Sequence, residues 1–322
     1  MAPPLLAWYA GARRDLPWRR TRDPWRILVS EIMLQQTRVR AVIPYYEKFL
    51  RRFPTPQALA QAAESEVLAL WSGLGYYWRA RRLQLAAQAI GAAPAFPGTY
   101  AELRALPGIG GYTAAAVASI AFDAAHAAVD GNVLRVIARV TNDASDTGAG
   151  VTRRRFQAIA DSWLEAAQPG TFNQALMELG ATVCLPRAPL CTACPLSGVC
   201  RARAAGTQAQ LPVKLGAAKP RAVDVQVVVA CKPGYVLLGQ RAAGEPRLAG
   251  FWELPEPARL PAATPLEPVA RVRHAIVNQL FRVTVLRCGP VRAPRGYRWI
   301  AADEAARLPL TTLTRKALAC IN

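Results

Sequence analysis

Glu31 is an acidic residue placed among apolar ones. It lies one helical turn after Ile27 and Leu28 in a segment that predicts a helix over residues 24–37. Leu34 follows one turn later, so the carboxyl is expected on the apolar face of that helix. Burial disfavours the charged form and raises a carboxyl pKa, which would let Glu31 donate a proton near neutral pH. The alternative is a glutamate at the edge of the face, with its head group in water.

Asp130 is a second candidate carboxyl. Asp130-Gly131-Asn132 stands shortly before an apolar-periodic helix that contains Val133, Val136 and Ile137. Aspartate at such a position commonly serves only as the helix N-cap, and this plain reading stays open beside a catalytic one.

A glycine-rich turn opens a helix in the segment Leu106-Pro-Gly-Ile-Gly-Gly-Tyr-Thr. Such a turn can bring free backbone N–H groups close to a phosphate, and this one resembles the helix-hairpin-helix motif of DNA repair proteins. The alternative is a simple connection between two helices.

Four cysteines crowd into seventeen residues with the spacing C-x6-C-x2-C-x5-C, namely Cys184, Cys191, Cys194 and Cys200. Four thiolates in a chain with two histidines suit a [4Fe–4S] cluster or a tetrahedral zinc ion, and the spacing leaves both open. His126 and His274 lack metal-ligand spacing, and we interpret His126 as structural.

Charge indicates a polyanionic partner. The 322 residues carry a formal charge of +19, a large excess that a polyanion would neutralise. The fractions of apolar residues, 52%, and charged residues, 19%, are typical of a folded globular protein. Residues 1–200 hold 21 basic and 14 acidic residues, and residues 201–322 hold 19 and 7, so both halves are basic. Nucleic acid fits this excess best, although ribosomal and membrane-surface proteins can share it.

The elements that position these residues suggest two domains. Short predicted helices, punctuated by proline and glycine, run from about residue 24 to 200, with Asp23-Pro24 as a cap and first-turn pair. The segment after the cysteines reads as a basic linker. Beyond it, two β-type runs joined by Lys232-Pro233-Gly234 predict a hairpin. We predict a mainly α domain over 1–203, a linker over 204–221 and an α+β domain over 222–322.

Taken together, these segments resemble the MutY family of adenine DNA glycosylases within the endonuclease III superfamily, over nearly the whole chain. The matching motifs are Arg14-Asp-Leu-Pro-Trp-Arg, Val29-Ser-Glu-Ile-Met-Leu-Gln-Gln-Thr, Gly73-Leu-Gly-Tyr-Tyr, the glycine-rich turn, Val129-Asp-Gly-Asn, Phe172-Asn-Gln-Ala-Leu-Met-Glu-Leu-Gly and the four cysteines. The resemblance implies a helix-hairpin-helix glycosylase fold and a [4Fe–4S] cluster on those cysteines.

The resemblance also implies roles for individual residues. The target adenine would be flipped out of the DNA duplex into a pocket. Glu31 would protonate adenine N7, and Asp130 would stabilise or trap the oxocarbenium-like sugar before water attacks. Tyr112 and Asn132 would position these groups. Residues of the adenine pocket would be Arg14, Leu16, Trp18, Val39, Gln174 and Met177. Gln36 and Tyr76 would enter the base stack as wedges, and Gly108 and Gly110 would hold the phosphate backbone.

A monofunctional reaction is expected. Relatives that also cleave the strand place a lysine where this chain has Tyr112, and that amine forms a Schiff base. The rival functions are an endonuclease III-type glycosylase and lyase for oxidised pyrimidines, and a non-catalytic DNA-binding protein. The missing lysine argues against the first, and the presence of Glu31 and Asp130 against the second.

The C-terminal domain resembles the family's Nudix-like domain at Leu237-Leu-Gly-Gln-Arg and Gly250-Phe-Trp-Glu-Leu-Pro, without the glutamate-rich box of active Nudix hydrolases. It is therefore expected to recognise and not to hydrolyse, and the resemblance implies that its target is 8-oxoguanine opposite the adenine. The family does so through a Phe-Ser-His loop, where this chain has Ile276-Val277-Asn278. Asn278 and Gln279 are the two candidate substitute donors.

The remaining expectations concern partners and location. We expect a monomer that binds double-stranded DNA containing an adenine mispair and involves no membrane. The sequence contains no run of eighteen apolar residues, and its N-terminus lacks the order of a signal peptide. A cytoplasmic, nucleoid-associated enzyme is therefore predicted.

Overall fold

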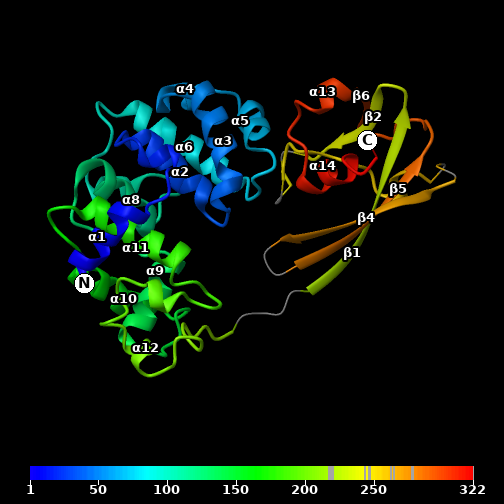
Figure 1. Ribbon diagram of the computed structural model, residues 1–322. Coiled ribbons are helices and arrows are strands. Elements are labelled where there is room, and N and C mark those ends of the chain that lie inside the picture. Colours follow the sequence, from blue (N-terminus) through cyan, green and yellow to red (C-terminus); the bar gives the residue numbers. More distant parts are fainter. Residues whose placement is uncertain are drawn as a thin grey trace. The chain divides into compact units, whose positions relative to one another are not determined.

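The computed structural model describes residues 1–216, 221–242, 244–245, 248–261, 263, 265–276 and 279–321. Contacts divide the chain into two compact units, residues 1–60 with 82–217 and residues 61–81 with 218–322. The first unit is helical, and the second carries the sheet (Figure 1). The predicted combination of a mainly α and an α+β part is confirmed. The predicted domain limits place residues 61–81 in the first part, whereas their contacts group them with the second.

The helical unit is built from short helices, as predicted from the proline and glycine spacing. In chain order they are α1 (Ala2–Ala12), η1 (Pro17–Arg19), α2 (Pro24–Leu34), α3 (Val39–Arg52), α4 (Pro56–Ala60), α6 (Trp78–Ala92), α7 (Tyr100–Ala105), α8 (Gly111–Phe122), α9 (Gly131–Thr141), α10 (Gly150–Trp163), α11 (Pro169–Thr182), η2 (Cys191–Ala193) and α12 (Arg201–Ala204). The first residues of α6 belong to the second unit.

Caps and turns fix where the important helices begin. Asp23 accepts hydrogen bonds from the N–H groups of Trp25 and Arg26 at the start of α2, as its position before Pro24 predicts. The helix predicted over 24–37 ends at Leu34, so the prediction that it continues to residue 37 was wrong. Gln36 takes a left-handed backbone conformation with φ 58°, which a continuing helix does not allow.

The helix-hairpin-helix consists of α7, the turn after it and α8. Thr99 and Glu102 form a capping box at the start of α7. Gly108 has φ 77°, a conformation that favours glycine, and Gly110 is the N-cap of α8. The predicted glycine-rich turn into a helix is confirmed.

A buried apolar core lies between α1, α9, α10 and α11. Because Val133, Val136, Ile137 and Val140 recur with helical spacing, α9 presents one apolar face to this core. The tight approach of α11 to its neighbours needs glycine: a Cβ on Gly180 would lie 2.7 Å from Asn132 Cβ. The core therefore fixes the backbone on which Asn132 stands.

The second unit contains a mixed sheet. Its strands are β1 (Arg221–Lys232), β2 (Tyr235–Gln240), β3 (Trp252–Glu253), β4 (Glu267–Ile276), β5 (Gln279–Cys288) and β6 (Tyr297–Ala301), with η3 (Pro257–Arg259), α5 (Glu64–Trp71), α13 (Ala302–Ala305) and α14 (Thr312–Leu318). The strand order is β3-β2-β1-β5-β4, and β6 pairs with β2. Strands β1 and β5 are parallel, and the other pairs are antiparallel.

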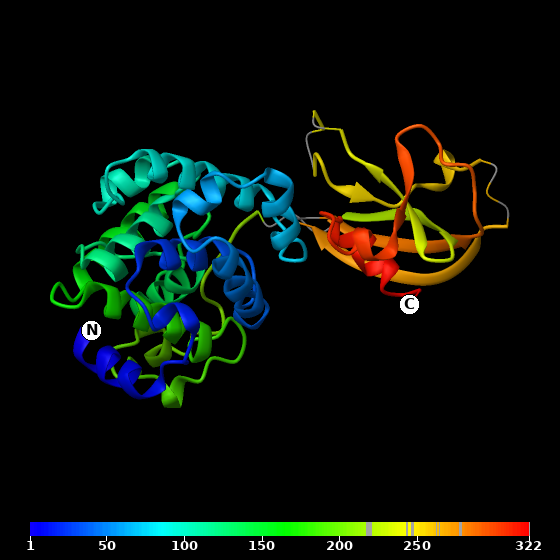
Figure 2. The same ribbon diagram turned by 90° about the horizontal axis from the view of Figure 1, so that it is seen from above.

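The predicted hairpin is confirmed, because Lys232 pairs with Tyr235 across the turn between β1 and β2. Separate apolar clusters form on the two faces of the sheet, one of them including residues of α13 and α14. Helix α14, in red, lies against strands β3 and β4 (Figure 2).

Residues 61–81 contact the C-terminal part of the chain directly. Arg315 Nη2 donates to Ser72 Oγ at 2.6 Å, and the ring of Tyr77 lies 4.2 Å from that of Phe251, centre to centre. The Tyr77 hydroxyl also lies 3.2 Å from Thr312 Oγ1. These contacts explain why the segment belongs to the second unit.

Candidate active site

Glu31 is buried in the helical unit, with 6% of its surface exposed. Its helix, α2, packs against α8, and α8 packs against α11 (Figure 1). Tyr112, near the start of α8, donates a hydrogen bond from its hydroxyl to Glu31 Oε2 at 2.7 Å. The same hydroxyl lies 3.0 Å from Met177 Sδ on α11. Three residues predicted separately thus meet, and Glu31 does not reach into water.

The environment of Glu31 suits a proton donor. Burial raises the pKa of Glu31 to about 7, the hydrogen bond from Tyr112 lowers it, the charge of Asp130 raises it, and Arg19 lowers it. A carboxyl with this pKa is partly protonated at neutral pH and can give its proton to a weakly basic nitrogen.

Asp130 is the N-cap of α9, and its side chain also accepts a hydrogen bond from the side chain of Asn132. Its Oδ1 accepts from the Val133 N–H at 2.8 Å, and its Oδ2 accepts from Asn132 Nδ2 at 2.9 Å. Burial raises the pKa of Asp130, whereas these hydrogen bonds favour its charged form. The plain cap interpretation is confirmed, and it is compatible with a chemical role because the charge of Asp130 acts on Glu31.

A hydrogen-bonded chain leads from Asp130 to the cysteine loop. Arg135 Nη2 donates to Asn132 Oδ1 at 2.9 Å and to the Gly180 carbonyl at 2.7 Å, and Arg135 Nε donates to the Cys184 carbonyl at 2.8 Å. Arg135 is a functional candidate that the sequence reasoning missed. Its signal was a basic residue within the apolar-periodic helix after Asp130.

Arg14 and Arg19 share one buried carboxylate. Arg14 donates to both oxygens of Glu178, from Nε at 2.7 Å and Nη2 at 2.6 Å, and Arg19 Nη2 donates at 2.7 Å. Burial alone raises the pKa of Glu178, but these hydrogen bonds outweigh it and hold the pKa at about 2. Arg19 and Glu178 were also missed. An acid in the apolar helix after Met177 is the same signal that identified Glu31.

The other residues predicted to line the adenine pocket are described by their own contacts and burial. Gln174 Oε1 accepts from Tyr9 Oη at 3.2 Å, one turn before Met177 on α11. Leu16 and Trp18 are buried, and Trp18 packs edge-on against Tyr46. Val39 begins α3 and is half-buried. The place of Leu16, Trp18 and Val39 in an adenine pocket stays a prediction.

The two predicted wedge residues share an unusual backbone. Gln36 is exposed with φ 58°, and Tyr76 is half-buried with φ 48°. Left-handed conformations are uncommon outside glycine and often mark functional loops. Gln36 belongs to the helical unit and Tyr76 to the second unit. Among the phosphate candidates, Gly108 and Gly110 lie in the turn before α8.

The four clustered thiols line one pocket beside α9 and the end of α11. Within the part of the chain that the structure describes, no three Cys, His, Asp or Glu side chains converge closely enough to hold a single metal ion. Four thiols that line one pocket form a soft donor set of the kind that iron–sulfur clusters and structural zinc sites use.

Arg139 supports this loop from beneath. It is 2% exposed and donates to the carbonyls of Leu185 at 2.7 Å and Leu211 at 3.0 Å. It also donates to Cys184 Sγ at 3.3 Å, a contact that would stabilise a thiolate ligand. Of the histidines, His126 is exposed and stacks on Tyr100, in line with its structural interpretation.

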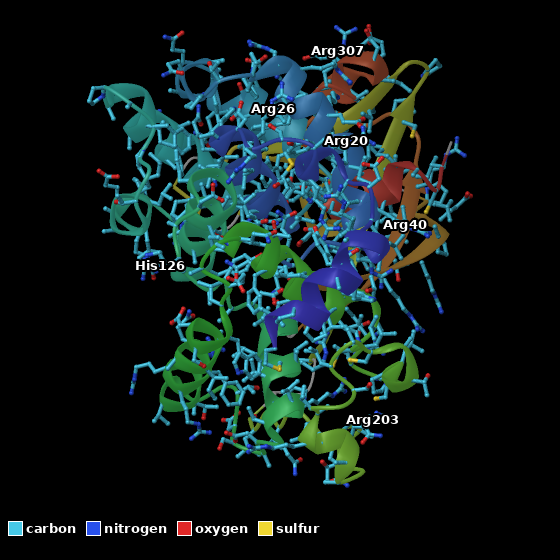
Figure 3. All side chains as sticks on the ribbon, turned by 60° about the vertical axis from the view of Figure 1, so that its left-hand side comes forward. Arg20, Arg26, Arg40, His126, Arg203 and Arg307 are labelled. Carbon is cyan, nitrogen blue, oxygen red and sulfur yellow. The ribbon has the colours of Figure 1, made fainter. Side chains whose placement is uncertain are left out.

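Positive side chains lie on the surface of the helical unit. Figure 3 labels Arg20, Arg26 and Arg40, all of which are exposed. Arg20 pairs with Asp15, and Arg26 lies 3.7 Å from Asp23. Among the described residues, no helix has both the length and the apolar character needed to cross a bilayer.

The last predicted site residue is not placed. Val277 and Asn278 lie outside the described residues, whereas Gln279 begins β5. The proposed use of Asn278 in base recognition therefore stays a prediction from the sequence.

Comparisons with known proteins support one family. The model of the HhH-GPD superfamily of base excision DNA repair proteins matches residues 29–161. The adenine DNA glycosylase of Mycolicibacterium smegmatis is 47% identical over 205 residues, which cover 63% of this chain and 69% of that protein. The mouse adenine DNA glycosylase is 38% identical over 348 residues, covering 90% of this chain and 65% of the relative.

Solved structures agree on the helical fold. A thermostable thymine-DNA glycosylase is 30% identical with a TM-score of 0.56, covering 63% of this chain and 94% of that one. An endonuclease III bound to DNA, 22% identical with a TM-score of 0.53, covers the same share of this chain and 94% of its own, and shows the fold alone. The chain spans 40% of the human adenine DNA glycosylase, at 47% identity over 220 residues, or 64% of this chain. From its motifs, its buried glutamate and these relatives, we conclude that the chain belongs to the MutY family of adenine DNA glycosylases.

Proposed function

We propose that this protein is a base excision repair enzyme that hydrolyses the N-glycosidic bond of adenine mispaired with 8-oxoguanine or guanine. The observation that carries the proposal is the buried Glu31, hydrogen-bonded to Tyr112 and under the charge of Asp130. A protonated carboxyl beside an ionisable one is the arrangement that sugar hydrolysis uses.

The reaction follows from the two carboxyl environments. With adenine flipped out of the duplex, Glu31 gives its proton to N7 as the C1′–N9 bond breaks, and the bonding electrons leave with the base. The positive charge that develops on the sugar is stabilised by the Asp130 carboxylate, which Asn132 orients. Water then adds to C1′ and gives up a proton to the Glu31 carboxylate, which restores the acid and leaves an abasic site.

Tyr112 restricts the enzyme to hydrolysis. Its phenol cannot form an imine with the opened sugar, so strand cleavage by the lyase route is not expected. Its hydrogen bond to Glu31 gives it a positioning role instead.

Duplex DNA binding rests on several features. The chain carries a net charge of +19, and the turn with Gly108 and Gly110 can approach a phosphate group with its backbone. Gln36 and Tyr76 would enter the base stack, and Arg14, Leu16, Trp18, Val39, Gln174 and Met177 would line the adenine pocket. We propose that the protein acts as a monomer near the nucleoid.

A [4Fe–4S] cluster would be held by Cys184, Cys191, Cys194 and Cys200. When bound, it ties the cysteine loop together and adds folding stability. This chain's own contribution is the pair Arg135 and Arg139, which join the loop to the helix that begins at Asp130.

For domain organisation, we propose glycosylase residues 1–203, a linker over 204–221 and a lesion-recognition domain over 222–322. The contacts of residues 61–81 cut across this division, because they attach the segment with Tyr76 to the second unit.

The proposal is tested by mixing the protein with duplexes that hold adenine opposite 8-oxoguanine, guanine or thymine. Free adenine should appear from the first two only, and the product strand should break only after alkali treatment. Borohydride should trap little covalent adduct. An efficient trap with damaged pyrimidine substrates and no free adenine would instead identify an endonuclease III-type lyase, whereas binding without release of any base would identify a non-catalytic protein.

A further inference from the structure

The hydroxyl of Tyr112 has one proton and two acceptors within reach. Glu31 Oε2 lies at 2.7 Å and Met177 Sδ at 3.0 Å. An O–H group makes one strong hydrogen bond, and thioether sulfur is a weak acceptor. The three groups come from α2, α8 and α11, so their meeting is set by helix packing and not by sequence proximity.

The protonation state of Glu31 decides between the acceptors. When Glu31 is ionised, its carboxylate accepts the hydrogen bond from the Tyr112 hydroxyl, because a charged acceptor makes the stronger hydrogen bond. When Glu31 is protonated, its own O–H can donate to the Tyr112 oxygen across the same 2.7 Å. The Tyr112 hydroxyl then donates its hydrogen bond to Met177 Sδ instead. Each hydroxyl proton thus has an acceptor in both states.

We propose that Met177 is a positioning residue. Its sulfur accepts a hydrogen bond from the Tyr112 hydroxyl whenever Glu31 is protonated, and this contact stabilises the proton-donating form of the acid. The catalytic consequence rests on the proposed function. The exchange of hydrogen bonds itself does not, because it concerns only side chains already in contact.

Charged neighbours act on Glu31 in a different way from Met177. The charge of Asp130 raises the pKa of Glu31, and Arg19 lowers it, whereas the Met177 side chain is neutral. Loss of the sulfur would remove an acceptor that is needed only in the protonated state. Met177→Leu should therefore lower the pKa of Glu31 without changing the local charge.

The direct test is NMR of protein labelled with carbon-13 at the methionine methyl groups. The chain has three methionines, Met1, Met33 and Met177, so each signal can be assigned by substitution. The Met177 methyl shift should titrate with a midpoint near the Glu31 pKa of about 7. Glu31→Gln and Tyr112→Phe should each abolish this titration, while the Met33 signal stays constant. A Met177 signal that does not change from pH 5 to 9 would overturn the proposal.

Kinetics give the second readout. The midpoint of the single-turnover pH profile should be lower in Met177→Leu than in the wild type by about half to one pH unit, as expected for one lost hydrogen bond, whatever the change in maximal rate. Met33→Leu, a buried volume-conserving change on α2, should leave the midpoint in place. An equal loss of rate at every pH would assign Met177 to pocket shape alone and contradict the inference. If the protein releases no adenine at all, the proposed function fails, and the NMR titration still decides this point.

Discussion

Arg135 Nη2 donates a hydrogen bond to Asn132 Oδ1 at 2.9 Å, and Asn132 in turn donates to Asp130. The same guanidinium reaches the carbonyls of Gly180 and Cys184. One buried cation therefore couples the orientation of the proposed catalytic carboxylate to the backbone of the cysteine loop.

Arg135→Gln should destabilise the protein and slow adenine release. The substitution leaves buried carbonyl groups without their donor, which should lower the free energy of unfolding by about 2–4 kcal/mol. Urea denaturation measures the loss. The control is Arg154→Gln on α10, because Arg154 is exposed. If the two variants are equally stable and active, the chain of contacts through Arg135 has no energetic role.

Glu178 should make stability depend on pH. Its pKa is about 2 in the folded protein, below the ordinary value of 4.5, so its contribution is present above about pH 4.5 and is lost as the pH falls toward 2. This shift corresponds to a contribution on the order of 3 kcal/mol at neutral pH. Glu178→Gln should therefore be less stable than the wild type at pH 7, and the difference should shrink between pH 4.5 and 3. A difference that stays constant over that range would contradict the assigned ion pair.

The cysteine loop should bind iron. Protein prepared anaerobically should be brown and contain iron and inorganic sulfide, because the four thiols line one pocket. Cys194→Ser should lose the colour and much of its stability, whereas Cys320→Ser should keep both, since Cys320 is exposed in the sheet-bearing unit. Stoichiometric zinc without iron or sulfide would show that the cluster proposal is wrong.

Preference for 8-oxoguanine should be weaker than in relatives with an intact Phe-Ser-His loop. A good hydrogen bond to a base gives about 1–3 kcal/mol of discrimination, so one lost contact reduces selectivity roughly 5- to 150-fold. Single-turnover excision opposite 8-oxoguanine and guanine should be compared in the wild type and in the triple variant Ile276→Phe, Val277→Ser, Asn278→His. If the wild type already discriminates as strongly as the variant, Asn278, Gln279 or a wedge residue performs the recognition.

The sequence predicted those features that depend on local pattern. The burial of Glu31 followed from apolar residues one turn before and after it, and the start of α2 followed from Asp23. Pairing between distant residues could not be predicted in this way. Arg14 and Glu178 are 164 positions apart, and only the packing of α11 against the N-terminal segment brings them together.

Backbone conformation in the loops was the other feature that the sequence did not predict. The helix predicted to residue 37 ends at Leu34, and Gln36 in the following loop lies in the left-handed region, which helix propensity does not predict. The attachment of residues 61–81 to the sheet-bearing unit likewise depends on contacts such as Arg315 with Ser72.

The most direct test of the mechanism is single-turnover release of adenine from an 8-oxoguanine:adenine duplex by the wild type and by Glu31→Gln. Glutamine keeps the size and hydrogen-bonding capacity of the side chain but has no proton to donate at neutral pH. The account predicts that Glu31→Gln binds this duplex as tightly as the wild type and releases adenine several orders of magnitude more slowly. A rate for Glu31→Gln close to that of the wild type would contradict the assignment of Glu31 as the acid.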